Sequence, residues 1–177
     1  MIRKNIKEII KEYYFINPTT KLRVRQIERL LKLPLPSVIR YCRELEKEGF
    51  LKKIKISGVV FYTADRTNKR FILEKRLFNI KQLYESGIID YLKKELSNPV
   101  IIVFGSYFRG EDTESSDIDL YIETKSNKKI ELKMFEKRLK REIQIFRHKN
   151  IREINNPYLA NNIINGYTLN GFIEVFK

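Results

Sequence analysis

Two aspartates, Asp117 and Asp119, stand at alternate positions in the apolar stretch DIDLYI. Alternate residues of a β-strand share one face, so we expect both carboxylates on one side and Ile118, Leu120 and Ile122 facing the core. The chain has one Cys and one His, which excludes a zinc site built from these two residue types. The paired carboxylates therefore predict an oxygen-ligated divalent cation, Mg2+ or Mn2+.

A second polar feature precedes the aspartates, at the end of the β-branched run Val100–Phe104. This continuous apolar run predicts a strand that is buried on both faces. Gly105 lets the backbone approach a ligand closely, and a helix that begins near Ser106 would present unpaired N–H groups to a phosphate. Residues 100–123 thus predict a strand, a turn, a short helix, a loop and a second strand.

The combined pattern resembles a known signature. Gly105-Ser106, ten further residues and then Asp117-Ile118-Asp119 are similar to the motif of the minimal nucleotidyltransferases of the DNA polymerase beta superfamily. The resemblance implies a nucleotide site formed by Gly105, Ser106, Arg109 and Ser116, and a catalytic metal site formed by Asp117 and Asp119. The implied ligands are Mg2+ (or Mn2+) and a nucleoside triphosphate, with ATP expected. The alternative is that the acids lie on a surface edge strand, which the apolar flanks disfavour.

The next strand, expected at residues 143–146, departs from the family pattern. Active relatives carry a third carboxylate there, and the matching position in this chain is Gln144. An amide oxygen can coordinate a metal, but it cannot act as a general base or supply negative charge. Glu142 lies two residues earlier and would substitute only through a shift in register. His148, expected just past the strand, is more typical of an exposed or capping residue than of a base.

Residues 1–66 predict a separate domain of three helices and a β-hairpin. The expected helices span residues 2–16, 24–31 and 36–48, and the strands span 50–56 and 59–64 around Ser57-Gly58. This order is the winged helix-turn-helix plan, and PSVIRYCRELEKEGFL resembles the recognition helix and first wing strand of many prokaryotic regulators. Cys42 aligns with the apolar positions of that helix, so we expect it in the core.

The resemblance implies that this domain binds duplex DNA. Arg40 and Tyr41 are the residues that we expect at or near the bases, whereas Lys53 and Lys55 are expected at phosphates. The candidate DNA contacts are Ser37, Arg40, Tyr41, Arg43, Lys53 and Lys55. A winged helix that mediates dimerisation or holds another protein is the alternative.

The remaining elements complete an α+β fold in which the second domain has a small mixed sheet. We expect domain ranges of 1–66 for the winged helix, 67–97 for a helical connector and 98–177 for the nucleotidyltransferase domain. Further helices are expected at 68–86, 88–96, 130–140 and 157–164, and a terminal hairpin about Asn170-Gly171. The wide apolar face of the 68–86 helix predicts packing on both domains or on a second copy. The whole order resembles archaeal proteins in which a winged helix is fused to a minimal nucleotidyltransferase.

The composition is that of a basic globular protein, with 36 Lys and Arg against 22 Asp and Glu. Residues 1–67 hold 16 of these bases and only 7 of the acids. Such an excess is typical of a domain with a polyanionic partner, although a Lys-rich proteome produces it as well. The sequence has no apolar run of membrane-spanning length and no signal-peptide core at its start, so the cytoplasm is the expected location.

Two functional hypotheses remain open from the sequence. In the first, the protein transfers a nucleotidyl group from NTP-Mg to a protein or nucleic-acid acceptor. By analogy with toxin–antitoxin pairs, the acceptor would be a toxin-type protein and this chain antitoxin-like. In the second, it is a DNA-binding transcriptional regulator whose weak or inert nucleotidyltransferase-like domain senses nucleotide or mediates assembly. The intact pair of aspartates favours the first hypothesis and Gln144 favours the second.

Overall fold

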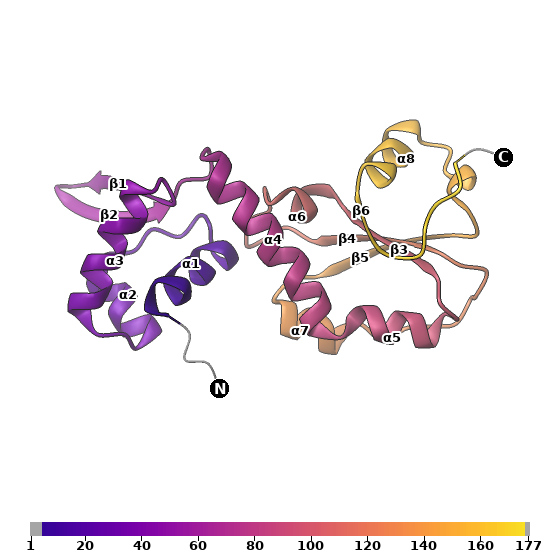
Figure 1. Ribbon diagram of the computed structural model, residues 1–177, viewed down its shortest axis with the longest axis horizontal. Coiled ribbons are helices and arrows are strands. Elements are labelled where there is room, and N and C mark those ends of the chain that lie inside the picture. The colour runs from indigo at the N-terminus through magenta and orange to yellow at the C-terminus, as the bar shows by residue number, and fades with distance from the viewer. Residues whose placement is uncertain (1–4, 176–177) are drawn as a thin grey trace. The chain divides into compact units, whose positions relative to one another are not determined.

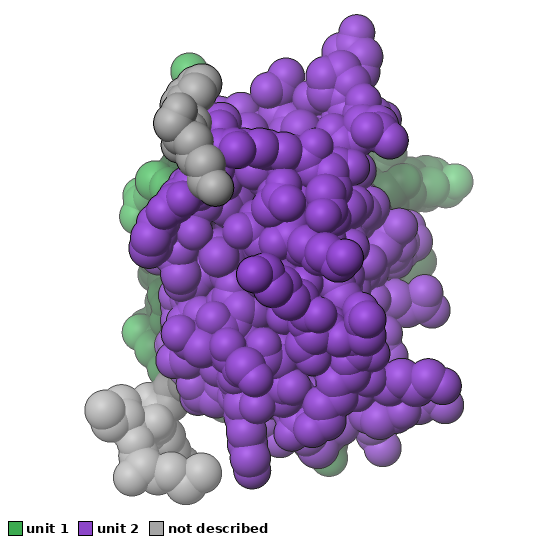
Figure 2. Space-filling model, turned by 90° about the vertical axis from the view of Figure 1, so that its right-hand side faces the viewer, with its two compact units in different colours: residues 1–78 green, residues 79–177 purple. Residues whose placement is uncertain are grey.

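The computed structural model describes residues 5–175 of the chain (Figure 1). The chain forms two compact units, residues 1–78 and 79–177, which are distinguished in Figure 2. The division lies within the long helix α4, Lys69–Ser86. Among the described residues, no helix combines the length and the apolar character needed to cross a lipid bilayer.

The first unit contains three helices followed by a β-hairpin, in the order that the sequence predicts. The elements are α1 (Ile6–Ile16), α2 (Val24–Leu31), α3 (Leu35–Lys47), β1 (Leu51–Ile56) and β2 (Val59–Ala64). The hairpin turns through Ser57 and Gly58, whose φ values of 49° and 77° are those of a two-residue turn between twisted strands. The expected strand pairing and turn are therefore confirmed.

Helix α1 begins at Ile6, four residues later than expected. The Asn5 side chain accepts a hydrogen bond from the Lys7 backbone N–H at 3.1 Å and so caps the helix at this point. Ile2, which we expected on the apolar face, lies outside the described residues. Helix α1 buries Ile10 and Tyr14 completely, and the Tyr14 hydroxyl donates a hydrogen bond to the Tyr62 carbonyl of β2 at 3.1 Å.

The core of the first unit joins all of its elements. Its fully buried members include Ile27 of α2 and three residues of α3, Val38, Cys42 and Leu45. Burial raises the pKa of the Cys42 thiol to about 12, as expected of a thiol that serves as a small apolar side chain. The placement of Cys42 in the core is confirmed.

The second unit is built on a four-stranded sheet with the order β5-β4-β3-β6. The strands are β3 (Val100–Phe104), β4 (Ile118–Glu123), β5 (Ile143–His148) and β6 (Tyr167–Asn170). Strand β3 is antiparallel to β4 and to β6, whereas β4 and β5 are parallel. The sheet is therefore mixed, which confirms the α+β class.

Helices cover both faces of this sheet, as Figure 1 shows for α8 on one side and α5 and α7 on the other. The helices are α5 (Ile88–Glu95), α6 (Gly105–Arg109), α7 (Lys133–Leu139) and α8 (Pro157–Ile164), with a 3-10 turn at Ile151–Glu153. Ile101 and Val103 face the core with α5 and α7, whereas Ile102 and Phe104 face the core with α8. The expected burial of β3 on both faces is confirmed.

Three expectations for the second unit were wrong in detail. Helix α7 begins at Lys133 rather than at Ile130, with Leu132 at the N-cap position and no side-chain cap. Strand β5 extends to His148, which therefore lies within the strand rather than past it. No second strand follows Gly171 within the described residues, so the terminal hairpin does not form there.

Strand β6 pairs with β3 at the edge of the sheet. The Asn170 side-chain amide donates hydrogen bonds to the Pro99 carbonyl at 2.6 Å and to Asn98 Oδ1 at 3.0 Å. Gly171 then passes close to Val100, whose Cα would lie 3.2 Å from a Cβ at residue 171. These contacts hold the turn against the start of β3, so the local Asn-Gly signal marks a bend and not a hairpin.

Candidate functional site

Gly105 and Asp119 lie against each other where β3 ends. The two strands pair with Phe104 opposite Asp119, which brings the following residue, Gly105, to the Asp119 side chain. Gly105 has a φ of +73°, and a Cβ at this position would lie 2.2 Å from Asp119 Oδ2. The backbone conformation favours glycine, and a Cβ at this position would have to displace the Asp119 carboxylate.

Asp117 and Asp119 bracket the first residue of β4. Ile118, Leu120 and Ile122 are completely buried, as the alternation predicts, while Asp119 is half-buried and Asp117 is exposed. Strand β4 begins only at Ile118, so the expectation that Asp117 lies within the strand was wrong by one residue. Both carboxylates stand at the end of β4 that adjoins the Gly105 turn.

The environment of Asp119 disfavours its charged form. Burial is the main cause of its raised pKa, and the negative charge of Asp117 raises it further, while the Arg109 guanidinium acts in the opposite direction. Arg109 also donates a hydrogen bond from Nε to Glu111 Oε2 at 2.7 Å. A cation placed beside the two aspartates would relieve both unfavourable effects on the Asp119 carboxylate.

Gln144 is the neighbour of Asp119 in the sheet. The parallel pairing of β4 and β5 places Asp119 opposite Gln144 and Ile118 opposite Ile143. The pairing continues without a shift to the end of β4, and the Ile118 N–H donates a hydrogen bond to the Glu142 carbonyl at 2.8 Å. Glu142 therefore stands beside Asp117 and not beside Asp119, and the register shift that would place it at the position of Gln144 does not occur.

His148 lies at the other end of β5. It pairs with Glu123, the last residue of β4, and its ring stacks on Tyr121 with the ring centroids 5.9 Å apart. Four residues along a strand correspond to roughly 13 Å, so His148 is distant from Gln144. This position excludes His148 as a base acting at the two aspartates.

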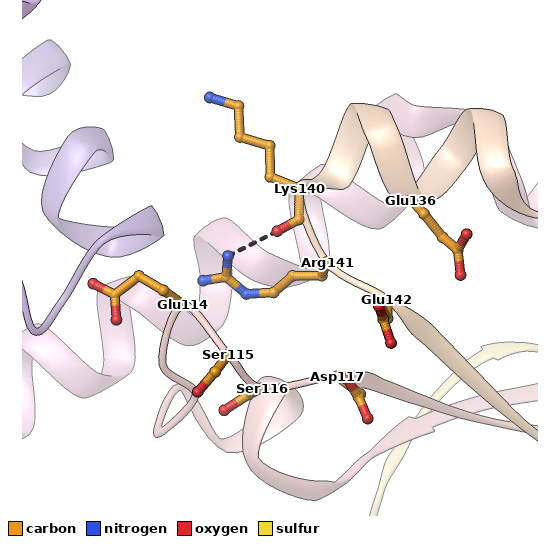
Figure 3. A pocket seen from close by; sticks show the side chains of 8 residues that line it. All are labelled: Glu114, Ser115, Ser116, Asp117, Glu136, Lys140, Arg141 and Glu142. Atoms are coloured by element: carbon orange, nitrogen blue, oxygen red, sulfur yellow. Dashed lines mark hydrogen bonds between the residues drawn. The ribbon is translucent and has the colours of Figure 1, made fainter.

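A cavity of about 530 Å³ opens beside Asp117 (Figure 3). Ser115, Ser116 and Asp117, from the loop before β4, form one wall, and the segment that joins α7 to β5 forms the other. The lining residues are Glu114, Ser115, Ser116, Asp117, Glu136, Lys140, Arg141 and Glu142. Gly105, Ser106 and Asp119 do not line this cavity, so it adjoins the pair of aspartates on the side of Asp117 only.

Ser116 stabilises the loop that carries Asp117. Its hydroxyl accepts a hydrogen bond from the Thr113 backbone N–H at 2.9 Å and lies 3.2 Å from the Thr113 hydroxyl. Ser106 lies in the first turn of α6, where its carbonyl accepts a hydrogen bond from the Glu111 N–H at 3.0 Å. The residues of the predicted nucleotide site thus gather around α6 and the loop that follows it.

A buried polar network that sequence reasoning missed anchors the same loop. Asp112 Oδ1 accepts a hydrogen bond from the Asn79 side-chain amide at 2.8 Å, and its other carboxylate oxygen lies 3.5 Å from the Arg141 guanidinium. The Asp112 and Arg141 side chains are only 1% and 5% exposed. The Asn79 amide also donates to the Tyr107 carbonyl of α6 at 2.8 Å. No local pattern marks these residues, because they come from three distant parts of the sequence.

The Asp117–Asp119 pair fits a divalent cation that completes its coordination with ligand oxygens. No group of three His, Cys, Asp or Glu side chains with metal-binding geometry occurs in residues 5–175. Mg2+ is usually held by one or two carboxylates together with water and substrate phosphates, rather than by a cage of protein ligands. Two carboxylates beside a backbone turn are consistent with that mode of binding.

The candidate DNA contacts of the first unit lie on α3 and β1. Arg40 is exposed, and its guanidinium stacks on the Tyr41 ring at 4.4 Å from the centroid and donates to the Tyr41 hydroxyl at 2.5 Å. Ser37 is half-exposed in the first turn of α3. Arg43 is exposed further along the same helix. These side chains belong to one element, as the sequence predicts.

The two wing lysines differ in their surroundings. Lys53 Nζ pairs with Glu46 Oε2 of α3 at 2.5 Å, and the hydrogen bond to this carboxylate raises the Lys53 pKa. Lys55 is exposed on β1 opposite Val60. To contact a DNA phosphate, Lys53 would have to give up its ion pair with Glu46. For Lys55, the described residues show no such partner.

Two arginines that we did not assign to DNA join Arg43 at a cavity of about 420 Å³. Arg23 and Arg25 come from the start of α2, and the Arg23 guanidinium stacks on the Phe61 ring of β2 at 5.1 Å. The apolar part of the lining includes Val24, Ile39, Val60 and Tyr62. The spacing of basic residues along α2 was the sequence signal that could have identified Arg23 and Arg25. Their approach to Arg43, however, depends on the packing of α2 against α3.

The comparisons with known proteins concern the second unit. A search of curated proteins found no significant match, and neither did a search of solved structures. Residues 86–169 match the model of the family described as "Polymerase beta, Nucleotidyltransferase". This range contains the Gly105 turn, both aspartates and Gln144. The match supports a nucleotidyltransferase-like domain at residues 86–169, within the second unit.

Proposed function

We propose that the second unit binds a nucleoside triphosphate, with ATP expected, together with Mg2+ or Mn2+, and transfers a nucleotidyl group. The observation that carries the proposal is the contact between Gly105 and Asp119, whose carboxylate occupies the space that a Cβ at residue 105 would fill. It brings a backbone turn suited to phosphate and a carboxylate suited to a metal to the same point. The family match over residues 86–169 supports the same function.

The proposed roles follow from the chemistry of each group. Gly105 and Ser106 bind the β- and γ-phosphates through backbone and hydroxyl donors, and Arg109 adds positive charge. Asp117 and Asp119 hold the metal. The metal supplies charge neutralisation and orientation of the phosphates when it is bound. An acceptor hydroxyl forms a bond to the α-phosphorus, the bond to pyrophosphate breaks, and the hydroxyl proton passes to solvent or to a partner group.

Gln144 makes weak catalysis the expected behaviour of the free chain. A neutral amide beside Asp119 adds no charge for a second metal and cannot accept a proton as a base. Nucleotide binding depends mainly on the Gly105 turn and the two aspartates, so it should remain strong. The presence of Gln144 in place of a carboxylate favours the second candidate function. This function is that of a regulator whose nucleotidyltransferase-like domain senses nucleotide or mediates assembly.

For the first unit, we propose that it is a winged helix that binds duplex DNA. The order of its elements, the exposed Arg40 and Arg43 on α3 and the exposed Lys55 on β1 support this proposal. Arg23 and Arg25 extend the basic surface beside Arg43. We further propose that the chain acts as a homodimer in the cytoplasm, where NTP and DNA are present, and that a toxin-type protein is one acceptor.

The direct test is calorimetric titration of the full chain with ATP, with and without Mg2+. We expect binding that requires Mg2+, because the triphosphate and the two carboxylates repel each other without a cation. Asp117→Asn combined with Asp119→Asn should abolish the dependence on Mg2+, whereas Asp90→Asn, an exposed aspartate of α5, should leave it intact. Equal affinity in the presence and absence of Mg2+ would remove the basis of the proposed site.

A further inference from the structure

One cavity of the first unit combines positive charge with apolar walls. It has a volume of about 420 Å³ and lies where α2, α3 and β2 come together. Three of its lining residues are arginines, and the others are Val24, Ile39, Val60 and Tyr62. Within the described residues, no acidic side chain lines it. We name this space the arginine cavity.

Strand β2 fixes two of the three arginines at the cavity. Leu22 and Tyr62 form an isolated β-bridge, in which the N–H of each residue donates to the carbonyl of the other, at 3.0 and 2.8 Å. The bridge holds the residue before Arg23 against β2, and the Arg23 guanidinium stacks on the Phe61 ring of the same strand. Arg25 follows in the first turn of α2. The start of α2 is therefore attached to the hairpin, which places both arginines beside the apolar wall.

Arg43 brings the third positive charge from α3. It lies one turn after Ile39, which lines the same cavity. Burial raises the pKa of the Tyr62 hydroxyl, while the positive charges of Lys53 and Arg43 act in the opposite direction. The charge of Arg43 thus acts at the Tyr62 wall of the cavity, and bases from two helices surround one apolar space.

No ion pair with an acidic side chain neutralises the three arginines within residues 5–175. Two acids of α3 are paired with other bases, since Glu44 lies 3.8 Å from Arg40 and Glu46 lies 2.5 Å from Lys53. An anion that enters the arginine cavity therefore gains basic partners without breaking an ion pair. Arginine suits this role, because its planar guanidinium donates paired hydrogen bonds to the oxygens of an acidic group.

The walls decide which kind of anion fits. Val60 is 38% exposed in spite of its apolar side chain, and Val24 and Ile39 are half-buried. A bare phosphate would leave these side chains in water, whereas an apolar body would cover them. Sites for small molecules have volumes of about 300–1,000 Å³, apolar walls and a few polar groups that fix the ligand. We propose that the arginine cavity binds a small organic anion. The arginines hold its acidic group, and its apolar body covers the walls.

The site lies beside the surface that we propose for DNA. Arg43 is one of the candidate DNA contacts, so an anion bound at Arg43 competes with a DNA phosphate for this charge. The bound anion therefore lowers the affinity for DNA, and by linkage DNA lowers the affinity for the anion. This competition rests on the proposed DNA binding, whereas the binding site itself does not.

The first experiment is a fluorescence titration of the full chain with 8-anilinonaphthalene-1-sulfonate, an aromatic body that carries one sulfonate. We expect saturable binding at one site per chain. N-phenyl-1-naphthylamine has the same aromatic body without the sulfonate and should bind about tenfold more weakly. Arg25→Ala with Arg43→Ala should raise the dissociation constant of the sulfonate by about tenfold. Arg29→Ala with Lys69→Ala removes two exposed bases outside the cavity and is the matched control.

The second experiment fills the cavity from within. Val60→Glu puts a carboxylate on the cavity wall, where it can pair with the arginines in place of the ligand. We expect this variant to lose the saturable binding while its far-UV spectrum stays that of the wild type. Ile56→Glu, at a position of the same hairpin that is 45% exposed and outside the cavity, should bind the probe normally. The amide chemical shifts of Val24 and Ile39 should move when the probe is added to the wild type, but not when it is added to Val60→Glu.

The results distinguish a failure of the anion site from a failure of DNA binding, because the titrations contain no DNA. Absence of saturable binding, equal affinity for the sulfonate and its uncharged analogue, or a cavity variant that binds as its control does, overturns the proposal. An Arg25→Ala, Arg43→Ala variant that loses genomic fragments but keeps the probe also overturns it, because the arginines then serve DNA alone. With DNA bound, saturating probe should raise the dissociation constant of the DNA, and an unchanged value would contradict the competition.

Discussion

Gln144 lies beside Asp119 in the parallel pairing of β4 and β5, where the proposed site would take its third carboxylate. The amide is exposed, so its replacement by a carboxylate of the same length should not disturb the core. Its effect on chemistry is thus separable from its effect on folding. This makes Gln144 the residue at which an active and an inert domain can be distinguished.

We expect Gln144→Glu to raise the rate of nucleotidyl transfer by about tenfold or more while leaving the affinity for ATP-Mg unchanged. An added negative charge at a catalytic metal is worth several kcal/mol, and about 1.4 kcal/mol corresponds to a tenfold change in rate. The measurement is transfer of label from ATP to acceptors in a cell lysate. Glu142→Gln, beside Asp117, is the control for charge in the same region. Rapid transfer by the wild type that Gln144→Glu does not improve would show that Gln144 is not at the catalytic position.

Gly105→Ala should abolish Mg2+-dependent ATP binding, because the new methyl group would occupy the space of the Asp119 carboxylate. We also expect a loss of stability of about 1–2 kcal/mol from the left-handed backbone alone. Gly87→Ala is the matched control, since Gly87 has a φ of +80° but no atom within 4 Å of its added Cβ. Chemical denaturation measures the loss of stability in both variants. Both share the backbone strain, and only Gly105→Ala adds the clash with Asp119, so the difference between them gives the cost of the clash. Equal behaviour of the two variants in stability and ATP binding would contradict the contact with Asp119.

Asp119 should make the metal-free protein less stable as the pH rises. Its pKa is raised in the folded state, so the folded protein favours the neutral acid. The destabilisation is absent below the ordinary aspartate pKa of 3.8, appears as the pH rises through that value and is complete above the raised pKa. Asp119→Asn should therefore raise the thermal midpoint at neutral pH without Mg2+, and the gain should vanish in acid. A gain of the same size at all pH values would contradict this cause.

Asp112→Ala should destabilise the second unit strongly. Arg141 is 5% exposed and loses the carboxylate that offsets its charge, a change that typically costs about 3–5 kcal/mol. Removing both charges, in Asp112→Ala with Arg141→Met, should cost less than Asp112→Ala alone. Urea denaturation of the single and double variants measures this difference. An additive loss in the double variant would show that the two side chains act independently.

Arg40→Ala should reduce the discrimination between DNA sequences, by about 1–3 kcal/mol at each base pair that Arg40 recognises. Lys55→Ala should instead weaken binding to all DNA sequences alike and lower the salt dependence of the affinity. The reason is that a phosphate contact releases counterions on any sequence. Fluorescence anisotropy of the full chain with genomic fragments at several salt concentrations provides both measurements. If the chain binds no genomic fragment in a salt-dependent manner, the DNA-binding proposal is excluded.

Local chemistry was sufficient to predict much of this fold. The β-branched run Val100–Phe104, the Ser57-Gly58 turn and the helix Pro157–Ile164 depend on interactions between residues that are close in sequence. The same holds for the alternation that buries Ile118 while Asp119 faces the other way. Short-range patterns of this kind survive in any tertiary context that offers an apolar surface to one face.

Only the tertiary structure decided which distant residues meet. The Asn170-Gly171 signal predicted a hairpin because it is local, but β6 pairs with the distant strand β3, and no strand follows Gly171 within the described residues. The burial of Arg141 against Asp112 joins segments that are 29 residues apart. The family resemblance placed Gln144 near the two aspartates, but its register opposite Asp119 depends on the parallel pairing of β4 and β5. Such contacts depend on the packing of a whole sheet and its helices, and the sequence of either partner carries no sign of the other.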